Sequence, residues 1–244
     1  MCGRFALPDN QESIIEAFDI ATNIQVELAH VLTPRYNIAP TDQIPVVISN
    51  KGERNMVSMR WGLIPFRTNE LKGRTAIDKQ GKSVNTPINA RAETVDSNGS
   101  FKRSFEKRRC IIPAGGFYEW KKNGTTKTPH WITSSESPWM GFAGLYTWWK
   151  SPDSKWMPSC TIITTVANSF MEPIHDRMPV ILPEGAYDLW LNQDTQDLSV
   201  LKEVLVPYPS DKMKAHPVSS LVNKVSNEGP DLINEVQFNS PTLI

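Results

Sequence analysis

The chain has 244 residues, of which 39% are hydrophobic and 21% are charged, and its formal net charge is zero. This composition is typical of a globular protein and excludes an intrinsically disordered one. No apolar run reaches about 18 residues and no basic segment precedes an apolar one at the start, so we expect no transmembrane helix, no membrane partner and no signal peptide. The cysteines form no C-x-x-C pair, which argues against a disulfide framework and a structural zinc site and favours a cytoplasmic location; they are Cys2, Cys110 and Cys160.

The charges are unevenly distributed along the chain. Residues 1–122 hold 18 Lys and Arg against 13 Asp and Glu, whereas residues 123–244 hold 8 against 13. A nucleic-acid partner would therefore need a local basic patch. Arg177 is the one arginine of the second half. It suits either bidentate contact with a phosphate or a surface salt bridge, and the sequence leaves both open.

The first third of the chain predicts one helix, two strands and a long polar segment. Asp9 or Asn10 can cap a helix over residues 10–19, whose apolar residues fall at helical spacing. Apolar, β-branched runs predict the two strands. The polar segment has no periodicity and predicts a long surface loop or a short helix. In chain order the strands and this segment are residues 44–49, 55–61 and 67–86.

The remainder is predicted to be mainly β, with short helices at residues 101–108 and 184–192. Strands separated by turns extend from Cys110 to about residue 166, and Asn123-Gly124 predicts a tight hairpin. We expect an α+β fold in which mainly antiparallel sheets curl into a barrel-like core with peripheral helices. Residues 1–230 would form a single, monomeric domain, and residues 231–244 a loosely ordered tail.

The second residue carries the most distinctive chemistry. Cys2 has a small side chain, and a start methionine is usually trimmed before such a residue. Trimming would leave an α-amine of pKa about 7.7–8.0 beside a thiol of pKa about 8.5. An amine condenses with an aldehyde to an imine, which the thiol can close to a five-membered thiazolidine; alternatively, the thiolate attacks a carbonyl with the amine as base. The competing interpretation is an accident of the start site.

Two further segments contain candidate acids and bases. Glu119 lies among aromatic residues on a predicted strand, where desolvation would raise its pKa; it could instead face solvent. His175 lies beside Asp176 and Arg177 in a loop and suits either proton transfer or a structural role. Glu93 is a second candidate carboxylate, with Arg91 as its expected ionic partner.

Asn89 and Arg91 are separated by one residue, so on a strand they would face the same side. An amide and a guanidinium on one face suit a phosphate or oxyanion cradle, and a buried hydrogen-bond network equally well. The sequence contains no G-x-x-x-x-G-K-[ST], G-x-G-x-x-G or H-E-x-x-H motif. We therefore expect no nucleotide cofactor and no metal.

Eight segments, running in order from residue 1 to residue 219, match one known family. They are MCGRF (1–5), RYNIAP (35–40), WGLIP (61–65), NARAET (89–94), CIIPAGGFYEW (110–120), FAGLY (142–146), IHDRMPVIL (174–182) and HPVS (216–219). Their number and order make the match specific. The chain resembles the SRAP family (SOS-response-associated peptidases), whose members process abasic sites in DNA.

The resemblance implies that the protein recognises abasic sites in single-stranded DNA, shields them during the DNA damage response, and associates with the nucleoid when bound. It implies a covalent thiazolidine between Cys2 and the aldehyde of the sugar. Asn89 would orient the terminal amine and the sugar, and Glu119 would move protons during imine formation and ring closure. His175 would act as acid or base in ring opening of the sugar and in reversal of the crosslink.

The resemblance also implies a set of DNA contacts. Phosphates supply most of the positioning where a base is missing, and exposed rings stack on flanking bases. The implied phosphate contacts are Arg4, Arg91 and Arg177, the implied pocket residues are Asn37 and Thr164, and the implied platforms are Pro40, Trp61 and Phe66. Family members often carry tryptophan shortly after W-G-x-x-P, where this chain has Phe66-Arg67-Thr68, which leaves its preference for duplex junctions open.

Three other activities compete with or accompany this interpretation. An N-terminal-nucleophile amidohydrolase or peptidase would use the Cys2 thiolate against an amide, although the later motifs do not suit a glutamine amidotransferase. β-Elimination at the abasic site is a plausible side reaction, because an imine acidifies the neighbouring carbon. A non-enzymatic nucleic-acid-binding module with a chance Cys2 would bind abasic DNA without any crosslink.

Overall fold

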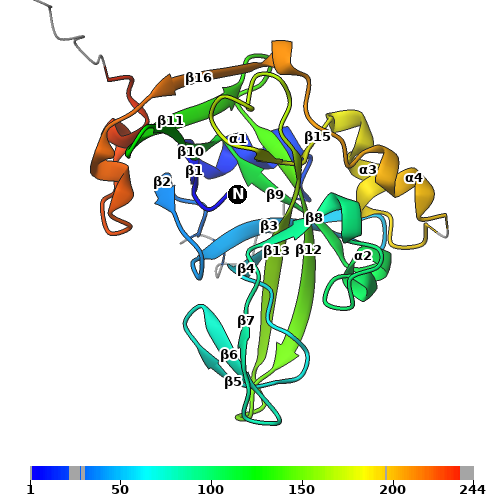
Figure 1. Ribbon diagram of the computed structural model, residues 1–244. Helices are drawn as coiled ribbons and strands as arrows, with labels where there is room; N and C mark the ends of the chain where they lie inside the picture. The colour runs from blue at the N-terminus through cyan, green and yellow to red at the C-terminus, as the bar shows by residue number, and fades with distance from the viewer. Residues whose placement is uncertain (1, 22–27, 29–30, 196, 237–244) are drawn as a thin grey trace, which may run out of the picture.

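The structure is a computed structural model that describes residues 2–21, 28, 31–195 and 197–236. Its centre is a closed barrel of five strands (Figure 1). These are β3 (Gln43–Asn50), β4 (Glu53–Trp61), β9 (Arg109–Ala114), β12 (Met140–Lys150) and β13 (Trp156–Val166). The ring runs β13-β4-β3-β9-β12 and returns to β13; β4 and β13 are parallel and the other four pairings are antiparallel. The predicted α+β fold with a mainly antiparallel, barrel-like core is confirmed.

Three short strands extend the barrel at the carboxyl end of β13. They are β8 (Asn89–Arg91), β14 (Arg177–Pro179) and β15 (Ile181–Leu182). β8 pairs in parallel with β13, and β14 pairs antiparallel to the same strand, placing Thr164 opposite Arg91 on one side. β15 pairs with β12. Segments that are almost 90 residues apart in the chain therefore meet at one end of β13.

A second sheet is antiparallel and brings both ends of the described chain together. Its order is β16 (Met213–Pro217), β11 (Thr126–Ser134), β10 (Gly116–Asn123), β1 (Phe5–Leu7) and β2 (Arg35–Ile38). Side chains alternate between its two faces, as the pleat requires. Phe117 belongs to the core shared with the barrel, whereas its neighbour Tyr118 packs on the other face with Trp131 and Leu232. The predicted hairpin is present, with Asn123 paired to Thr126.

The helices are short and peripheral. They are α1 (Gln11–Phe18), α2 (Lys102–Lys107), α3 (Tyr187–Leu191) and α4 (Ser199–Glu203). Asn10 caps α1 by accepting a hydrogen bond from the Ser13 N–H, as predicted, and Ile14 and Phe18 bury one face of the helix. The helix predicted over residues 184–192 is shorter, because residues 184–186 form a 3-10 turn before α3 begins.

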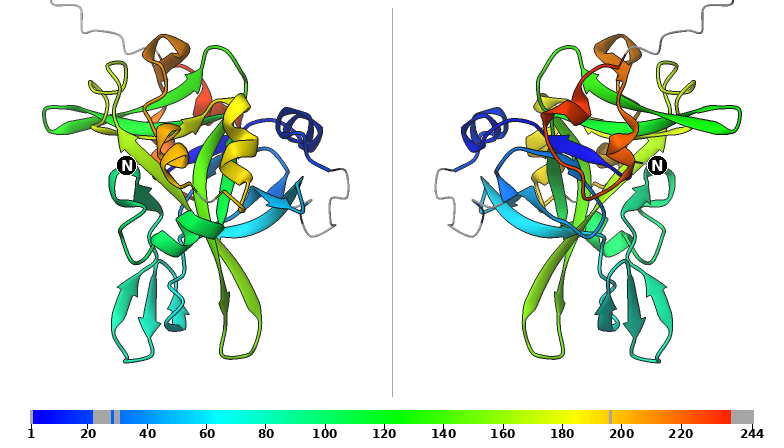
Figure 2. Two further views of the ribbon diagram at one scale, coloured as in Figure 1. Left: turned by 90° about the vertical axis from the view of Figure 1, so that its right-hand side faces the viewer. Right: turned by 90° about the vertical axis from the view of Figure 1, so that its left-hand side faces the viewer.

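The polar segment at residues 67–86 differs from its prediction as a loop or short helix. It forms a three-stranded antiparallel sheet, β5 (Thr68–Lys72), β6 (Thr75–Asp78) and β7 (Ser83–Asn85), which projects below the barrel beside the β12–β13 hairpin (Figure 2). Gly73 and Gly81 form its turns with positive φ angles of 53° and 77°. Two tethers fix it to the barrel: Arg60 donates to the Gly73 carbonyl, and Trp149 donates to the Thr68 carbonyl at 2.9 Å. The prediction was wrong because these strands depend on tethers and turns, and not on an alternating apolar pattern.

The last part of the described chain packs against the second sheet. Pro230–Ile233 forms a 3-10 turn with Leu232 buried, and Val218 pairs with Glu235. Residues 237–244 of the expected tail lie outside the described residues. Within the described part of the chain, no helix is long and apolar enough to cross a membrane.

Candidate active site at the start of the chain

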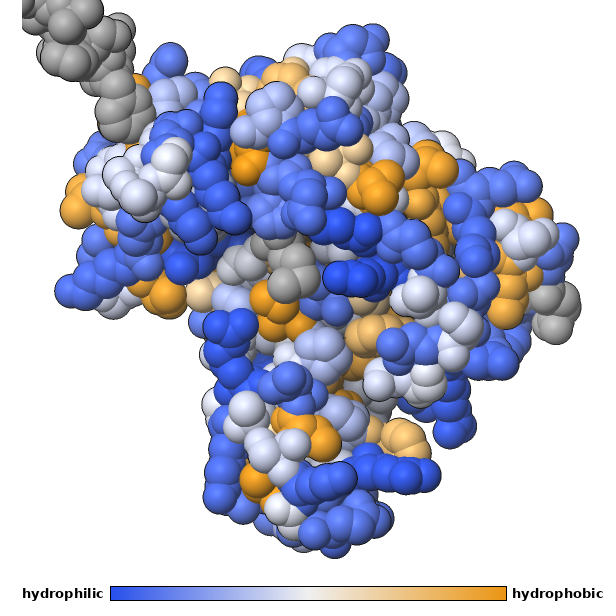
Figure 3. Space-filling model, viewed as in Figure 1, coloured by the Kyte–Doolittle hydropathy of each residue, from blue (hydrophilic) through white to orange (hydrophobic). Residues whose placement is uncertain are grey.

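Cys2 lies three residues before Phe5, the first residue of β1. Its side chain is completely buried, and β1 is held between β10 and β2. Burial raises the pKa of the Cys2 thiol far above its usual value, and the negative charge of Glu119 acts in the same direction. Figure 1 shows β1 near the centre of the view, and Figure 3 shows mainly polar and charged residues on this face of the molecule, with smaller hydrophobic groups among them. At neutral pH the thiol is therefore protonated and enclosed.

Glu119 lies on β10 opposite His130 and is 3% exposed. Burial is the main reason that its pKa is raised to about 7, and the charge of Asp176 adds to the increase. Of the two orientations that the sequence left open, the structure has the buried one. A carboxyl that titrates near neutrality can both donate and accept a proton at working pH.

His175 lies in the loop before β14. Its Nδ1 accepts a hydrogen bond from the Arg177 backbone N–H at 3.0 Å and lies 2.9 Å from a carboxylate oxygen of Asp176. Burial lowers the pKa of His175, although Asp176 opposes this effect. A neutral imidazole that accepts at Nδ1 carries its proton on Nε2, so in this form His175 offers an N–H donor at Nε2.

Asn89 is the first residue of β8 and is aligned with Ile162 of β13. Both polar atoms of its side chain are buried, and neither has a hydrogen-bond partner among the described residues. A buried amide without partners is costly in a folded protein, by about 1–3 kcal/mol. Such an amide is typical of a site where a ligand supplies the missing hydrogen bonds.

Arg177 forms a bidentate ion pair, which is one of the two roles that the sequence left open. Its Nη1 and Nη2 lie 2.6 and 3.0 Å from the carboxylate oxygens of Glu93, and Nη2 also donates to the Thr164 carbonyl at 2.6 Å. This pairing lowers the pKa of Glu93. The expected partner of Glu93 was Arg91, whose side chain is instead exposed. Glu93, Thr164 and Arg177 thus form one cluster at the end of β13.

Arg4 and Asn37 contact each other and a loop near the end of the chain. Arg4 Nη1 donates to Asn37 Oδ1 at 2.5 Å and to the Val222 carbonyl at 2.7 Å, and its guanidinium lies over the Trp120 ring. The Asn37 amide donates to the carbonyls of Val222, Lys224 and Asn227. Both side chains therefore position the loop at residues 222–227 beside the site.

The three residues expected to stack on bases lie in different environments. Trp61 is completely buried, donates to the Ile88 carbonyl at 3.0 Å and packs edge-on against Phe5, so it presents no free ring face. Pro40 is partly buried. Phe66 is 74% exposed, and the Arg67 guanidinium lies 5.3 Å from its ring centre. Only the last of the three offers an open aromatic surface.

The chain matches the family of SOS response associated peptidases (SRAP) over residues 1–225. It belongs to the SRAP family. The abasic site processing protein YoqW of Bacillus subtilis is 42% identical, covering 96% of this chain and 99% of its own. The abasic site processing protein HMCES of Gallus gallus is 30% identical, covering 85% of this chain and 68% of its own.

Solved structures show the same fold. A protein from Bacteroides thetaiotaomicron superimposes with a TM-score of 0.83 at 23% identity, covering 97% of this chain and all of its own. A protein from Bordetella bronchiseptica superimposes with a TM-score of 0.72 at 29% identity, covering 89% of this chain and all of its own. The barrel with its second sheet is therefore the fold of this SRAP chain and of these proteins.

Sequence reasoning missed several residues of the candidate site. Asp176 contacts His175 and raises the pKa of Glu119, and the carbonyls of Val222 and Asn227 bind the Asn37 amide. The adjacency of Asp176 to His175 was a usable signal, whereas nothing in the sequence indicates backbone carbonyls. Within the described residues, no group of three or more His, Cys, Asp or Glu side chains could hold a metal ion.

Proposed function

We propose that this SRAP protein recognises abasic sites in single-stranded DNA and, once Met1 has been removed, attaches Cys2 covalently to the lesion. Two similar proteins, from Bacillus subtilis and Gallus gallus, are named abasic site processing proteins. An abasic site exposes an aldehyde when its sugar ring opens. The product would be a thiazolidine that joins protein and DNA and shields the lesion.

The proposed reaction has two steps, and its atoms balance. The α-amine of Cys2 adds to the aldehyde carbon, and the resulting carbinolamine loses one water to give an imine. Glu119 would protonate the departing hydroxyl, which leaves the imine protonated on nitrogen and Glu119 as a carboxylate. The thiol sulfur then bonds to the imine carbon, the nitrogen keeps its proton, and the carboxylate of Glu119 takes the proton of the thiol. The net change is the loss of one water.

The single observation that carries the proposal is the burial of Cys2 beside a carboxyl that titrates near pH 7. A thiol with a strongly raised pKa is a poor attacking thiolate. This disfavours direct attack on an amide, as a peptidase or amidohydrolase would require, and favours a sequence in which the amine reacts first. Glu119 then has the right pKa to exchange protons at each step.

The other candidate residues would bind and orient the sugar and its phosphates. The Asn89 amide, unpartnered among the described residues, would hydrogen-bond the sugar, and His175 would assist opening of the sugar ring and reversal of the crosslink. Arg177 would contact a phosphate while its ion pair with Glu93 fixes its direction. The imine stage also permits β-elimination, so a low lyase activity would accompany the crosslink.

The decisive experiment mixes the purified protein with single-stranded DNA that carries one abasic site. We expect a heat-stable band on a denaturing gel and an intact mass equal to protein without Met1, plus DNA, minus one water. Cys2→Ser retains an amine that can form an imine but lacks the thiol. It should give only a heat-labile adduct that borohydride traps.

Cys2→Ala and a glutaminase assay separate the competing functions. A protein whose mass confirms a free Cys2 terminus but that gives no stable band contradicts the proposal. Glutamine hydrolysis by the same sample would point to an amidohydrolase. Equal noncovalent binding by wild type and Cys2→Ala, with no crosslink by either, would identify a simple binding module.

A further inference from the structure

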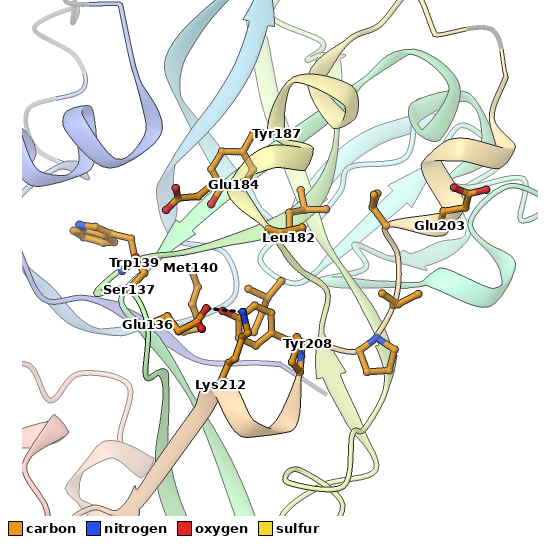
Figure 4. Close-up of a pocket in the computed structure, with 16 residues that line it drawn as sticks. Glu136, Ser137, Trp139, Met140, Leu182, Glu184, Tyr187, Glu203, Tyr208 and Lys212 are labelled. Carbon is orange, nitrogen blue, oxygen red and sulfur yellow. Dashed lines mark hydrogen bonds and ion pairs between the residues drawn. The ribbon is translucent and has the colours of Figure 1, made fainter.

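A groove of about 590 Å³ lies outside the candidate site, and the proposed function leaves it unused (Figure 4). Its walls come from three parts of the chain: the loop between β11 and β12, the segment from β15 into α3, and the segment from the end of α4 to the start of β16. Its volume lies in the range of sites that enclose a small ligand or a few side chains of a partner. The groove is therefore large enough to be a binding site of its own.

The floor of the groove is apolar. Met140, Ile181 and Leu182 line it, and each of them belongs to the main core with at most 4% of its surface exposed. Val206 adds an apolar side chain at the rim, where it is 53% exposed. The rim also contains three prolines, whose fixed φ angles limit its movement: Pro183, Pro207 and Pro209. An apolar surface that is already rigid loses little entropy when a ligand covers it.

The rim of the groove is acidic. Glu136, Glu184 and Glu203 line it and are exposed, and Figure 4 shows them at different sides of Leu182. Lys212 is the one cation among the lining residues, and its Nζ lies 2.9 Å from a carboxylate oxygen of Glu136. Neither Glu184 nor Glu203 has an ion-pair partner in the part of the chain that the structure describes. Three carboxylates and one ammonium give the lining a net charge of −2.

The charges and rings of the groove restrict the class of ligand. Nucleic acid does not suit it, because the carboxylates repel phosphates. A small ammonium ion would leave the apolar floor uncovered. The Tyr187 ring is also already engaged, since it stacks on Phe18 with 5.6 Å between ring centres and has the Arg54 guanidinium 5.6 Å from its own centre. A chain that carries both apolar and cationic side chains matches the floor and the rim together.

One short segment joins the groove to the candidate active site. Ile181 is six positions after His175 in the chain, and six residues of extended chain span at most about 20 Å. Asn168, in the same connection between β13 and β14 as His175, donates to the carbonyl of Tyr208 at 2.5 Å, and Tyr208 lines the groove. A partner in the groove would therefore lie close to the residues that are proposed to hold the lesion.

We propose that this acid-rimmed groove docks an extended segment of a partner protein, in which apolar residues are flanked by Lys or Arg. The apolar side chains cover Met140 and Leu182, and the cationic ones pair with Glu184 and Glu203. Docking does not depend on the proposed chemistry of Cys2, because the groove shares no residue with that site. It adds a means of bringing a second protein to DNA that this SRAP protein has bound.

The test measures the binding of fluorescein-labelled peptides to the purified protein by fluorescence anisotropy. The first peptide is Lys-Lys-Leu-Ala-Leu-Lys-Lys, whose leucines lie on one face when the chain is extended. In the second peptide serine replaces each leucine, and in the third glutamate replaces each lysine. We expect saturable binding of the first peptide alone. Its affinity should fall as the salt concentration rises, because salt screens exposed charges.

Charge reversals at exposed positions locate the binding site. Glu184→Lys and Glu203→Lys should each weaken binding of the first peptide about fivefold, because each replaces an attraction by a repulsion at a partly screened surface. Glu70→Lys is the matched control: it changes the net charge by the same amount on the small sheet β5–β7, outside the groove, and should bind like wild type. Val206→Ser should weaken binding about threefold, because it removes exposed apolar surface, and should leave the salt dependence unchanged.

Four results would overturn the proposal. Wild type might bind the first peptide without saturation, or bind the serine peptide equally well. An equal loss for Glu70→Lys would indicate a general attraction between net charges. Displacement of the peptide by spermidine as readily as by unlabelled peptide would assign the groove to small ammonium ions. Dimerisation of wild type in sedimentation experiments, abolished by Glu184→Lys, would assign it to a second copy of the chain. Urea midpoints close to that of wild type verify that each variant is folded.

Discussion

The Glu119 carboxyl is buried on β10 and shares its surroundings with the Cys2 thiol and the Asp176 carboxylate. Its pKa of about 7 reflects desolvation, which favours the protonated carboxyl over the carboxylate. The aromatic residues around Glu119 in the sequence indicated burial as one of two orientations, and a solvent-facing side chain was the other. The contribution of Asp176 was not predictable, because 57 positions separate it from Glu119 in the chain.

Glu119→Gln should alter the pH dependence of crosslinking. If the protonated carboxyl assists loss of water from the carbinolamine, the wild-type rate constant should fall as the pH rises through about 7. The rate constant of the glutamine variant should be lower than that of wild type below pH 7, and it should not fall as the pH rises through 7. Single-turnover rate constants for wild type and for Glu119→Gln, read from denaturing gels between pH 5.5 and 9, give the two pH profiles. A variant with the wild-type profile would remove Glu119 from the proton transfers.

The same carboxyl should make stability depend on pH. In the unfolded chain its pKa is about 4.3, so between about pH 4.3 and 7 the folded state retains a proton that the unfolded state has released. The resulting stabilisation is present below pH 4.3 and is lost as the pH rises to about 7, by an amount of the order of 3 kcal/mol. Urea unfolding of wild type and Glu119→Gln at pH 5 and pH 8 isolates the contribution of this carboxyl. If the free energies of unfolding of the two proteins differ by the same amount at both pH values, the prediction is contradicted.

At the scale of elements, the predictable parts were those with their own local signals. Asn10 and the helical spacing of Ile14 and Phe18 predict α1, and Asn123-Gly124 predicts the β10–β11 turn. The small sheet β5–β7 lacks such signals. Its position depends on hydrogen bonds from Arg60 and Trp149, which belong to other strands and come close only in the folded protein.

Arg109 connects α2 and α3 to the barrel and should be essential for stability. Its guanidinium is completely buried and donates to the carbonyls of Phe105, Glu106 and Trp190 at 2.7 Å, and also to that of Asn192. These carbonyls end two helices, where a cation is favoured. Burial lowers its pKa to about 10, so it remains charged at neutral pH.

Arg109→Leu should reduce the free energy of unfolding by at least about 3 kcal/mol, because each buried carbonyl left without a donor costs about 1–3 kcal/mol. Arg103→Leu, on the exposed side of α2, should stay within about 0.5 kcal/mol of wild type. The urea concentrations at the unfolding midpoints of wild type and of the two variants measure these changes in stability. Equal midpoints for the two variants would show that water replaces the guanidinium at these helix ends.

At the scale of the whole molecule, the strands of the two larger sheets come from distant parts of the chain. β1 begins at Phe5 and β16 ends at Pro217, yet both belong to one sheet, and the barrel takes strands from residues 43–166. The described core therefore does not divide into a part from the first half of the chain and a part from the second half. The absence of any compositional boundary predicts a single domain, but it does not indicate which strands are neighbours.

This interleaving should make unfolding a single cooperative transition. Far-ultraviolet circular dichroism reports the sheets, and fluorescence reports the 8 tryptophans. The two curves should coincide across a urea titration, since neither sheet retains its partners without the other. An earlier transition by either probe would indicate that residues 1–230 contain separately folding units.

The central position of β1 also has a consequence for biosynthesis. Strand β10, which pairs with β1, begins at Gly116, so β1 has no partner on that side until more than a hundred further residues have left the ribosome. At about 5–20 residues per second, this delay lasts about 6–25 seconds. Once β1 is paired, Cys2 is completely buried. An aminopeptidase that frees the Cys2 amine therefore has this interval in which to act before the neighbours of β1 enclose Cys2.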